Sequence, residues 1–154
     1  MPKVLLSIPY QPQQSDGDCL AACAAMALAY LGQPIDYAQL LQLLEIKPYG
    51  APAGNICRLA RLNLKVAYSQ TDMSGLVSML QDSWPVIVFV NTKELPYWSH
   101  GTDHALLVVG CDESQLYVND PAHAKSPIAV PKGDFELAWL ARDYYYALIT
   151  PMHD

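Results

Sequence analysis

Cys19 stands at a change from polar to apolar sequence, where a thiol is well placed to act as a nucleophile. The segment 13–18 is polar, whereas the residues from Cys19 to Leu31 are nearly all apolar and predict a buried helix. A thiol attacks as its thiolate, which is favoured at the positive end of a helix or beside an imidazolium. We therefore expect Cys19 in the first helical turn, with its backbone N–H facing a developing oxyanion and with Gln13 or Gln14 as a second donor.

His104 begins an apolar segment and is the candidate base for Cys19. A polar turn centred on residue 112 separates this segment from a second one that ends at Asn119, and together they predict a β-hairpin. In that hairpin His104 and Asp120 lie nearly opposite each other on one face, with Cβ atoms about 4.5–5.5 Å apart. Asp120 can then hold one ring nitrogen and leave the other for the thiol. A shift of the register by one residue would present Asn119 instead.

The same residues also have less specific interpretations. Cysteine is among the most buried residue types, so Cys19 can be a core residue, as we expect of Cys23 one turn further into the helix. A histidine at the start of an apolar strand is often structural, and Asp120 followed by Pro121 can simply end a strand. The candidate function therefore depends on the combination of these residues.

A metal site is a further alternative, built from cysteines and histidines. The candidate ligands are Cys19, Cys23, His100, His104 and His123. The Cys-x3-Cys spacing within a helix is not that of a zinc knuckle, and no second close pair supports it. A calcium loop beginning at Asp16 would have Ala27 where an EF-hand needs a bidentate glutamate. We therefore predict neither a metal nor another cofactor.

The predicted elements indicate an α+β fold, with an amino-terminal helical part packed on an antiparallel β-sheet. Hydrophobic periodicity and capping residues predict helices over 19–31 (capped by Asp16 or Asp18), from a cap at Asp36 to residue 44, after a cap at Asn55, over 73–80 and over 135–140. Apolar segments predict strands over 65–69, 86–90, 104–110, 115–119 and 144–149. No repeat or change of composition divides the chain, so we expect a single domain over residues 1–154.

The composition limits the class of protein. Hydrophobic residues make up 52% and charged residues 16%, so the chain can form a sizeable core. A net charge of -6 argues against nucleic acid as a partner, because nucleic acid is bound by basic surfaces. The most apolar run, Cys19 to Leu31, is shorter than the roughly 20 residues of a membrane span, and the first residues do not form a signal peptide. We expect a cytoplasmic protein whose four cysteines are reduced.

The residues around Cys19 resemble the amino-terminal motif of the C39 peptidases and their C39-like relatives. The matching residues are Gln13-Gln14-Ser15-Asp16-Gly17-Asp18-Cys19, then Met26, Tyr30 and Gly32. Members of this family have papain-like domains that remove leader peptides after a double glycine during bacteriocin export. The segment Pro85-Val86-Ile87-Val88 also resembles the central strand of the family.

This resemblance implies a role for each candidate residue. Gln13 matches the oxyanion residue, Cys19 the nucleophile, His104 the base at the head of a strand, and Asp120 the aspartate of an Asp-Pro that follows the next strand. The chain has Leu20 where the family commonly has glycine, which alters the backbone near the oxyanion hole. No membrane domain or ATPase follows in this sequence, so we expect no encoded coupling to an exporter.

We therefore expect a cysteine peptidase or amidase that forms an acyl-enzyme, with leader-peptide processing as the activity that the resemblance implies. The same centre can deamidate protein glutamine side chains or transfer the acyl group to another amine. A peptide-binding module without turnover is the non-catalytic alternative. We expect the peptide or protein substrate beside the loops 47–54 and 91–103, with Gly54, Tyr97 and Trp98 as candidate contacts. The oligomeric state stays open.

Overall fold

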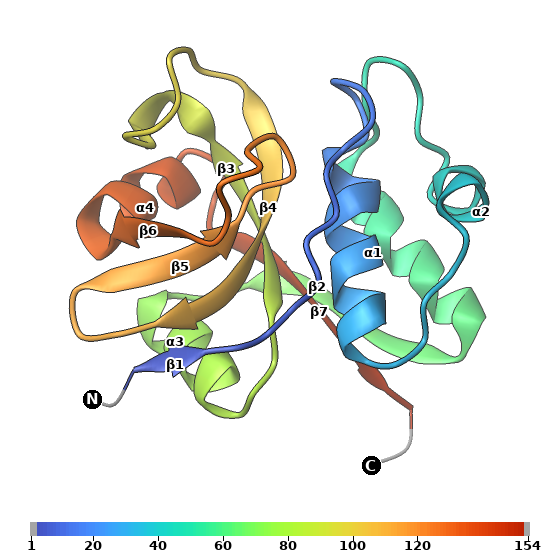
Figure 1. Cartoon of the computed structure of the whole chain (residues 1–154), viewed down its shortest axis with the longest axis horizontal. Coiled ribbons are helices and arrows are strands. Elements are labelled where there is room, and N and C mark those ends of the chain that lie inside the picture. Colours follow the sequence, from blue (N-terminus) through green and yellow to red (C-terminus); the bar gives the residue numbers. More distant parts are fainter. Residues whose placement is uncertain (1–2, 153–154) are drawn as a thin grey trace.

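The fold is built on an antiparallel β-sheet that lies between two groups of helices (Figure 1). A computed structural model describes residues 3–152 and gives them a seven-stranded sheet in the order β2-β7-β3-β4-β5-β6, with β1 paired to β4. The strands are β1 (Val4–Leu5), β2 (Leu64–Gln70), β3 (Val86–Asn91), β4 (Asp103–Cys111), β5 (Gln115–Asn119), β6 (Ile128–Pro131) and β7 (Tyr145–Pro151). Every pairing between them is antiparallel. The predicted α+β fold, with a helical part packed on an antiparallel sheet, is confirmed.

The amino-terminal helices cover one face of the sheet. They are α1 (Cys19–Tyr30), α2 (Tyr37–Leu43) and the 3-10 helix η1 (Ala53–Leu62). Helix α1 carries no charged residue, so it can be enclosed without desolvating a charge. Its Met26 and Leu28 are fully buried in a core that includes Phe89 and Leu107 of the sheet. The start of α1 is thereby held against the middle of the sheet.

The opposite face of the sheet is covered by α3 (Met73–Gln81) and α4 (Lys132–Leu140), and a short 3-10 helix η2 (Thr92–Glu94) follows β3. Leu76, Phe135 and Trp139 form a second core there with alternate residues of β3, such as Val88. Strand β3 is therefore buried on both faces, as its continuous apolar run predicts. No helix within residues 3–152 is long and apolar enough to cross a membrane.

Several elements differ from the sequence-based prediction. Strands β1 and β6 were not predicted, because they are short and have little alternation of apolar and polar residues. The segment predicted to start at an Asn55 cap is the 3-10 helix η1, which begins at Ala53. The Asn55 side chain instead donates to the Leu44 carbonyl over 2.9 Å and ties η1 to the end of α2.

The β4–β5 hairpin has a different register from the predicted one. The turn brings Cys111 opposite Leu116, and a bulge further along leaves Leu107 opposite Asn119. Continuing this register places Asp120 beside Leu106, two residues from His104. Because side chains alternate with a period of two, the shift keeps His104 and Asp120 on one face. They are diagonal neighbours, not directly opposite ones.

Candidate active site

Cys19 is the first residue of α1, as predicted. Asp18 occupies the N-cap position, but its side chain makes no cap to the helix. Its buried carboxylate turns back and accepts from the backbone N–H groups of Gln14 and Ser15 over 2.9 and 2.8 Å, and from the Tyr37 hydroxyl over 2.6 Å. Asp18 therefore fixes the segment that leads to Cys19 and does not cap the helix.

His104 contacts both a carboxylate and the Cys19 thiol. Its Nε2 lies 2.7 Å from Asp120 Oδ1, which leaves Nδ1 as the ring nitrogen available to Cys19. The His104 side chain is 5% exposed and that of Asp120 is 0% exposed, so water is nearly excluded from this hydrogen bond. The ring is held by a buried carboxylate on one side and faces a thiol on the other.

The electrostatics of the pair favour a thiolate beside an imidazolium. Burial raises the pKa of the Cys19 thiol, but its hydrogen bond to His104 and the charge of that ring outweigh burial and lower the pKa below its ordinary value. Burial lowers the pKa of His104, whereas its hydrogen bonds to Asp120 and Cys19 raise it to about 9. The proton is therefore favoured on the ring and not on the sulfur.

Asp120 is held by several donors besides His104. Its Oδ1 also accepts from the Ala122 backbone N–H over 2.9 Å, and its Oδ2 accepts from the Tyr97 hydroxyl over 2.7 Å and from the Trp98 indole N–H over 3.0 Å. Burial raises the pKa of Asp120, but the His104 contact and the two aromatic donors lower it to about 2. Asp120 is thus a fixed anion at neutral pH.

Asn119, the alternative partner of His104, lies on the other side of the sheet. It is paired with Leu107, whose side chain belongs to the core under α1. The Asn119 amide nitrogen lies 3.7 Å from the Met26 sulfur. Of the two residues, Asp120 is therefore the one that contacts the ring of His104.

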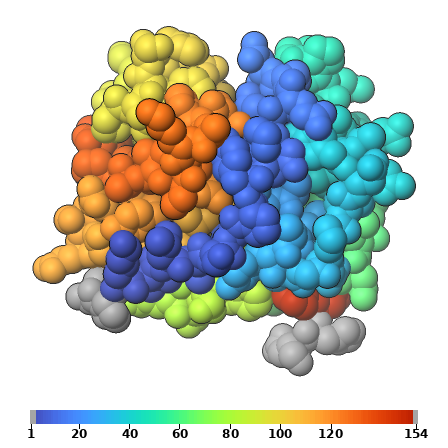
Figure 2. Space-filling view, viewed as in Figure 1, coloured from blue at the N-terminus to red at the C-terminus, as the bar shows by residue number. Residues whose placement is uncertain are grey.

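A cavity of about 300 Å³ opens beside Cys19 and His104. Figure 2 shows a notch at its place, between the yellow surface that follows β3 and the blue and teal surfaces near the start of α1 and the start of η1. One wall is formed by Gly50, Ala51, Pro52 and Ala53, whose side chains are small. Asp16, Asp103 and Arg142 add charge to the lining, and Asp103 lies 3.8 Å from Arg142. The small residues of this wall leave space for an extended segment of chain next to the sulfur.

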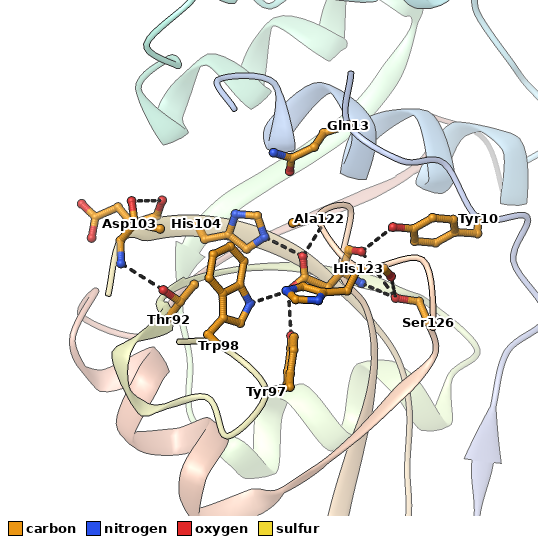
Figure 3. A network of polar contacts seen from close by, with 12 residues as sticks. Tyr10, Gln13, Thr92, Tyr97, Trp98, Asp103, His104, Ala122, His123 and Ser126 are labelled. Atoms are coloured by element: carbon orange, nitrogen blue, oxygen red, sulfur yellow. Dashed lines mark hydrogen bonds and ion pairs between the residues drawn. The ribbon is translucent and has the colours of Figure 1, made fainter. Parts of the chain in front are cut away.

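None of the three residues expected to contact substrate lines this cavity. Gly54 does not line the cavity, whose wall ends at its neighbour Ala53. Tyr97 and Trp98 also lie outside the lining, because their polar atoms are turned to Asp120 (Figure 3). The sequence identified the loop 91–103 as important, but it did not predict that the polar atoms of these aromatic residues contact Asp120. Their contact with substrate stays a prediction.

Gln13 lies in the segment before α1, on the α1 side of His104 (Figure 3). Its Nε2 donates to the Ser15 carbonyl over 3.0 Å, and its buried Oε1 has no partner within residues 3–152. It lines a depression with Tyr10 and Pro121 that adjoins the Cys19 cavity. One N–H of the Gln13 amide remains for another acceptor, since the amide carries two.

The other cysteines lie in different environments. Cys23 is fully buried, and burial raises the pKa of its thiol well above the ordinary value. Cys57 is exposed and Cys111 is buried, and all four cysteines are unpaired. Within the described residues no cluster of histidine, cysteine or carboxylate side chains could hold a metal ion. Cys19 is therefore distinguished from the other thiols by its contact with His104.

Arg142 and Tyr37 are site residues that the sequence analysis missed. Arg142 lies just before the last strand and reaches the cavity wall through Asp103, while Tyr37 binds Asp18 from α2. Both contacts join residues far apart in the chain. No local pattern of sequence indicates them.

Comparisons of the sequence with known proteins find similar proteins. The sequence model of the peptidase C39 family matches residues 7–149. The pediocin PA-1 transport/processing ATP-binding protein PedD of Pediococcus acidilactici is 30% identical over 132 residues, which cover 84% of this chain and 17% of PedD. The chain therefore spans a small part of the length of that relative.

Solved structures have the same fold. A C39-like peptidase from Bacillus anthracis superposes with a TM-score of 0.82 at 18% identity, covering 97% of this chain and 98% of that one. A double glycine motif protease from an AMS/PCAT transporter, in complex with the leader peptide, superposes with a TM-score of 0.76 at 21% identity. The match covers 96% of this chain and 94% of that one. The peptidase domain of Streptococcus ComA, a bifunctional ABC transporter, superposes with a TM-score of 0.75 at 22% identity. The match covers 96% of this chain and 98% of that one.

Proposed function

Since the chain belongs to the peptidase C39 family, we propose that it is a cysteine peptidase in which Cys19, His104 and Asp120 form the catalytic centre. In this proposal the Cys19 thiolate attacks the carbonyl carbon of a peptide bond and forms a tetrahedral oxyanion. The Cys19 backbone N–H and the free N–H of Gln13 stabilise that oxyanion. His104 gives its proton to the leaving amine, and water then releases the acyl-enzyme.

The observation that carries the proposal is the hydrogen-bonded series from Cys19 through His104 to the buried Asp120. A thiol next to a neutral, unsupported histidine would stay protonated at neutral pH, whereas the anion behind the ring favours the ion pair. A non-catalytic peptide-binding domain would have no need of a buried carboxylate in this position. The peptidase is therefore favoured over the binding module.

We propose a leader peptide that ends in a double glycine as the substrate. One support is the cavity wall of residues 50–53, which has no large side chain beside the sulfur. The other is the structural relative that is described as a double glycine motif protease in complex with its leader peptide. Glycine at the scissile bond lets the peptide backbone approach the sulfur and this wall closely, because it has no side chain to accommodate.

Mass spectrometry of a synthetic double-glycine leader peptide, incubated with the protein, tests this function. We expect two fragments separated after the second glycine, and no fragments with Cys19→Ala. A mass gain that corresponds to conversion of a glutamine amide to an acid, without fragments, would indicate a deamidase. Binding of the peptide without any change in mass, equal for wild type and Cys19→Ala, would overturn the proposed peptidase in favour of a binding module.

A further inference from the structure

The carboxylate of Asp120 has more donors than an orienting residue requires. Within the described residues its Oδ1 accepts from His104 and Ala122, and its Oδ2 accepts from Tyr97 and Trp98. A carboxylate can rotate about its bond to the chain, and rotation would turn Oδ1 away from the ring. The two donors on Oδ2 define the plane of the carboxylate and so define the direction in which Oδ1 points.

Trp98 also covers the histidine. The centroids of its ring and the His104 ring are 5.0 Å apart with an interplanar angle of 59°. Figure 3 shows the Trp98 indole directly beside His104, and Tyr97 donates to the same carboxylate oxygen of Asp120 as Trp98. The indole occupies space from which water could compete for Nε2, consistent with the 5% exposure of His104. Trp98 therefore contacts both members of the pair.

The loop that carries these aromatic residues is anchored at both ends. The buried Thr92 hydroxyl donates to the His100 carbonyl over 2.8 Å and accepts from the Thr102 N–H over 2.9 Å. The backbone N–H of Trp98 donates to the carbonyl of buried Leu95 over 3.1 Å. The two side chains are thus presented to Asp120 by a fixed loop.

We propose that Tyr97 and Trp98 are positioning residues, which act through Asp120 to hold His104 in the orientation that makes Cys19 a thiolate. The inference rests on the proposed thiol chemistry of Cys19. Burial raises the pKa of the Tyr97 hydroxyl and Asp120 raises it further, so this group stays a donor over the working range of pH. Substrate contact is not their role in this proposal, because neither lines the cavity.

The rate at which iodoacetamide alkylates Cys19 tests this role without any substrate. The thiolate displaces iodide from the reagent carbon, and mass spectrometry of the Cys19 peptide follows the product. The decisive quantity is the ratio of the rate at about pH 6 to the rate at about pH 10, since only the first depends on the ion pair. Above the ordinary thiol pKa of 9.0 the sulfur is ionised in any case.

Tyr97→Phe and Trp98→Phe each remove one donor and keep a ring. We expect each to lower this ratio about tenfold, the size of a lost hydrogen bond to a charged group, with little change in the rate at high pH. The matched control for the first is Tyr117→Phe, which removes a 2.6 Å hydrogen bond to Asp112 far from the site. Trp84→Phe, at the opposite end of β3, is the control for the second.

The outcomes separate the two proposals. A wild-type Cys19 with the low ratio of an unfolded chain would overturn the proposed thiol chemistry itself. A high wild-type ratio that stays unchanged in folded Tyr97→Phe would leave that chemistry intact and overturn the positioning role. Because Trp98→Phe is the larger change of side chain, Tyr97→Phe decides the question if Trp98→Phe does not fold. Equal falls in all four variants would also contradict the proposal.

Discussion

Gly17 faces Pro48 so closely that a Cβ at position 17 would lie 2.5 Å from the Pro48 carbonyl oxygen. The same atom would lie 2.7 Å from the Lys47 carbonyl oxygen and 2.8 Å from the Gly50 nitrogen. All three are backbone atoms, so no side chain can move aside. The residue two positions before the nucleophile therefore docks the turn that leads into the cavity wall.

Gly17→Ala should displace the turn 47–50 and so change the shape of the cavity beside Cys19. We expect a loss of about 1–3 kcal/mol in the free energy of unfolding, as for other overpacked sites, measured by urea denaturation. Gly133→Ala is the control, because a Cβ there meets nothing within 4 Å and lies in the first turn of α4. That variant should be neutral or more stable by up to about 1 kcal/mol. Equal stability of Gly17→Ala and wild type would contradict the prediction.

Labelling by a thiol-directed acylating probe should depend on two residues of the candidate site. In a Cys57→Ser background, which removes the exposed thiol, wild type should be labelled at Cys19. Cys19→Ala and His104→Ala should each abolish labelling at neutral pH while the circular dichroism spectrum persists. Cys23→Ala is the control and should be labelled normally, since that thiol is buried. Undiminished labelling of Cys19→Ala would exclude Cys19 as the nucleophile.

Peptidase activity should decline as the pH rises through about 9. The pKa of His104 is raised from 6.5 to about 9, so the ring is protonated below that pH and loses its proton above it. The leaving amine takes its proton from this ring, and kcat/KM therefore falls on the alkaline side. Alkylation of Cys19 needs no proton donor and should not fall over the same range. Parallel profiles for the two reactions would contradict the proposed role of His104.

Asp120→Asn should lower peptidase activity and shift the alkaline limb of its pH profile. An amide presents both an oxygen and an NH2 group, so it must direct a donor at either His104 or Trp98, which both donate to the carboxylate. Loss of the anion also lowers the pKa of His104 towards 6.5. We expect kcat/KM to drop about tenfold or more and its alkaline limb to move to lower pH.

Asp112→Asn is the matched control for this change. Asp112 also accepts a tyrosine hydroxyl, from Tyr117, but lies in the exposed β4–β5 turn. Its amide variant should leave both the rate and the pH profile as they are in wild type. A limb that does not move in Asp120→Asn would show that the charge of Asp120 has no influence on the ring.

Hydrophobic periodicity was sufficient to predict most of the helices and strands, because a buried face produces apolar residues at regular spacing within a short segment. The predicted hairpin also brought His104 and Asp120 to one face, although the turn and the bulge between Val108 and Gly110 together changed which residues are directly opposite. The orientation of Tyr97 and Trp98 could not be predicted. It depends on how the loop 91–103 is tied by Thr92, and such contacts leave no periodic signal in the chain.

The sulfur and the ring are supplied by different layers of the molecule. Cys19 comes from the helix packed on one face, whereas His104 belongs to the sheet. A separation of the two layers by little more than a hydrogen-bond length would break the ion pair and loosen the core between α1 and the sheet, while the core on the opposite face of the sheet remained packed. The reactivity of Cys19 therefore reports whether α1 is docked on the sheet. Low concentrations of denaturant should abolish this reactivity before any loss of secondary structure.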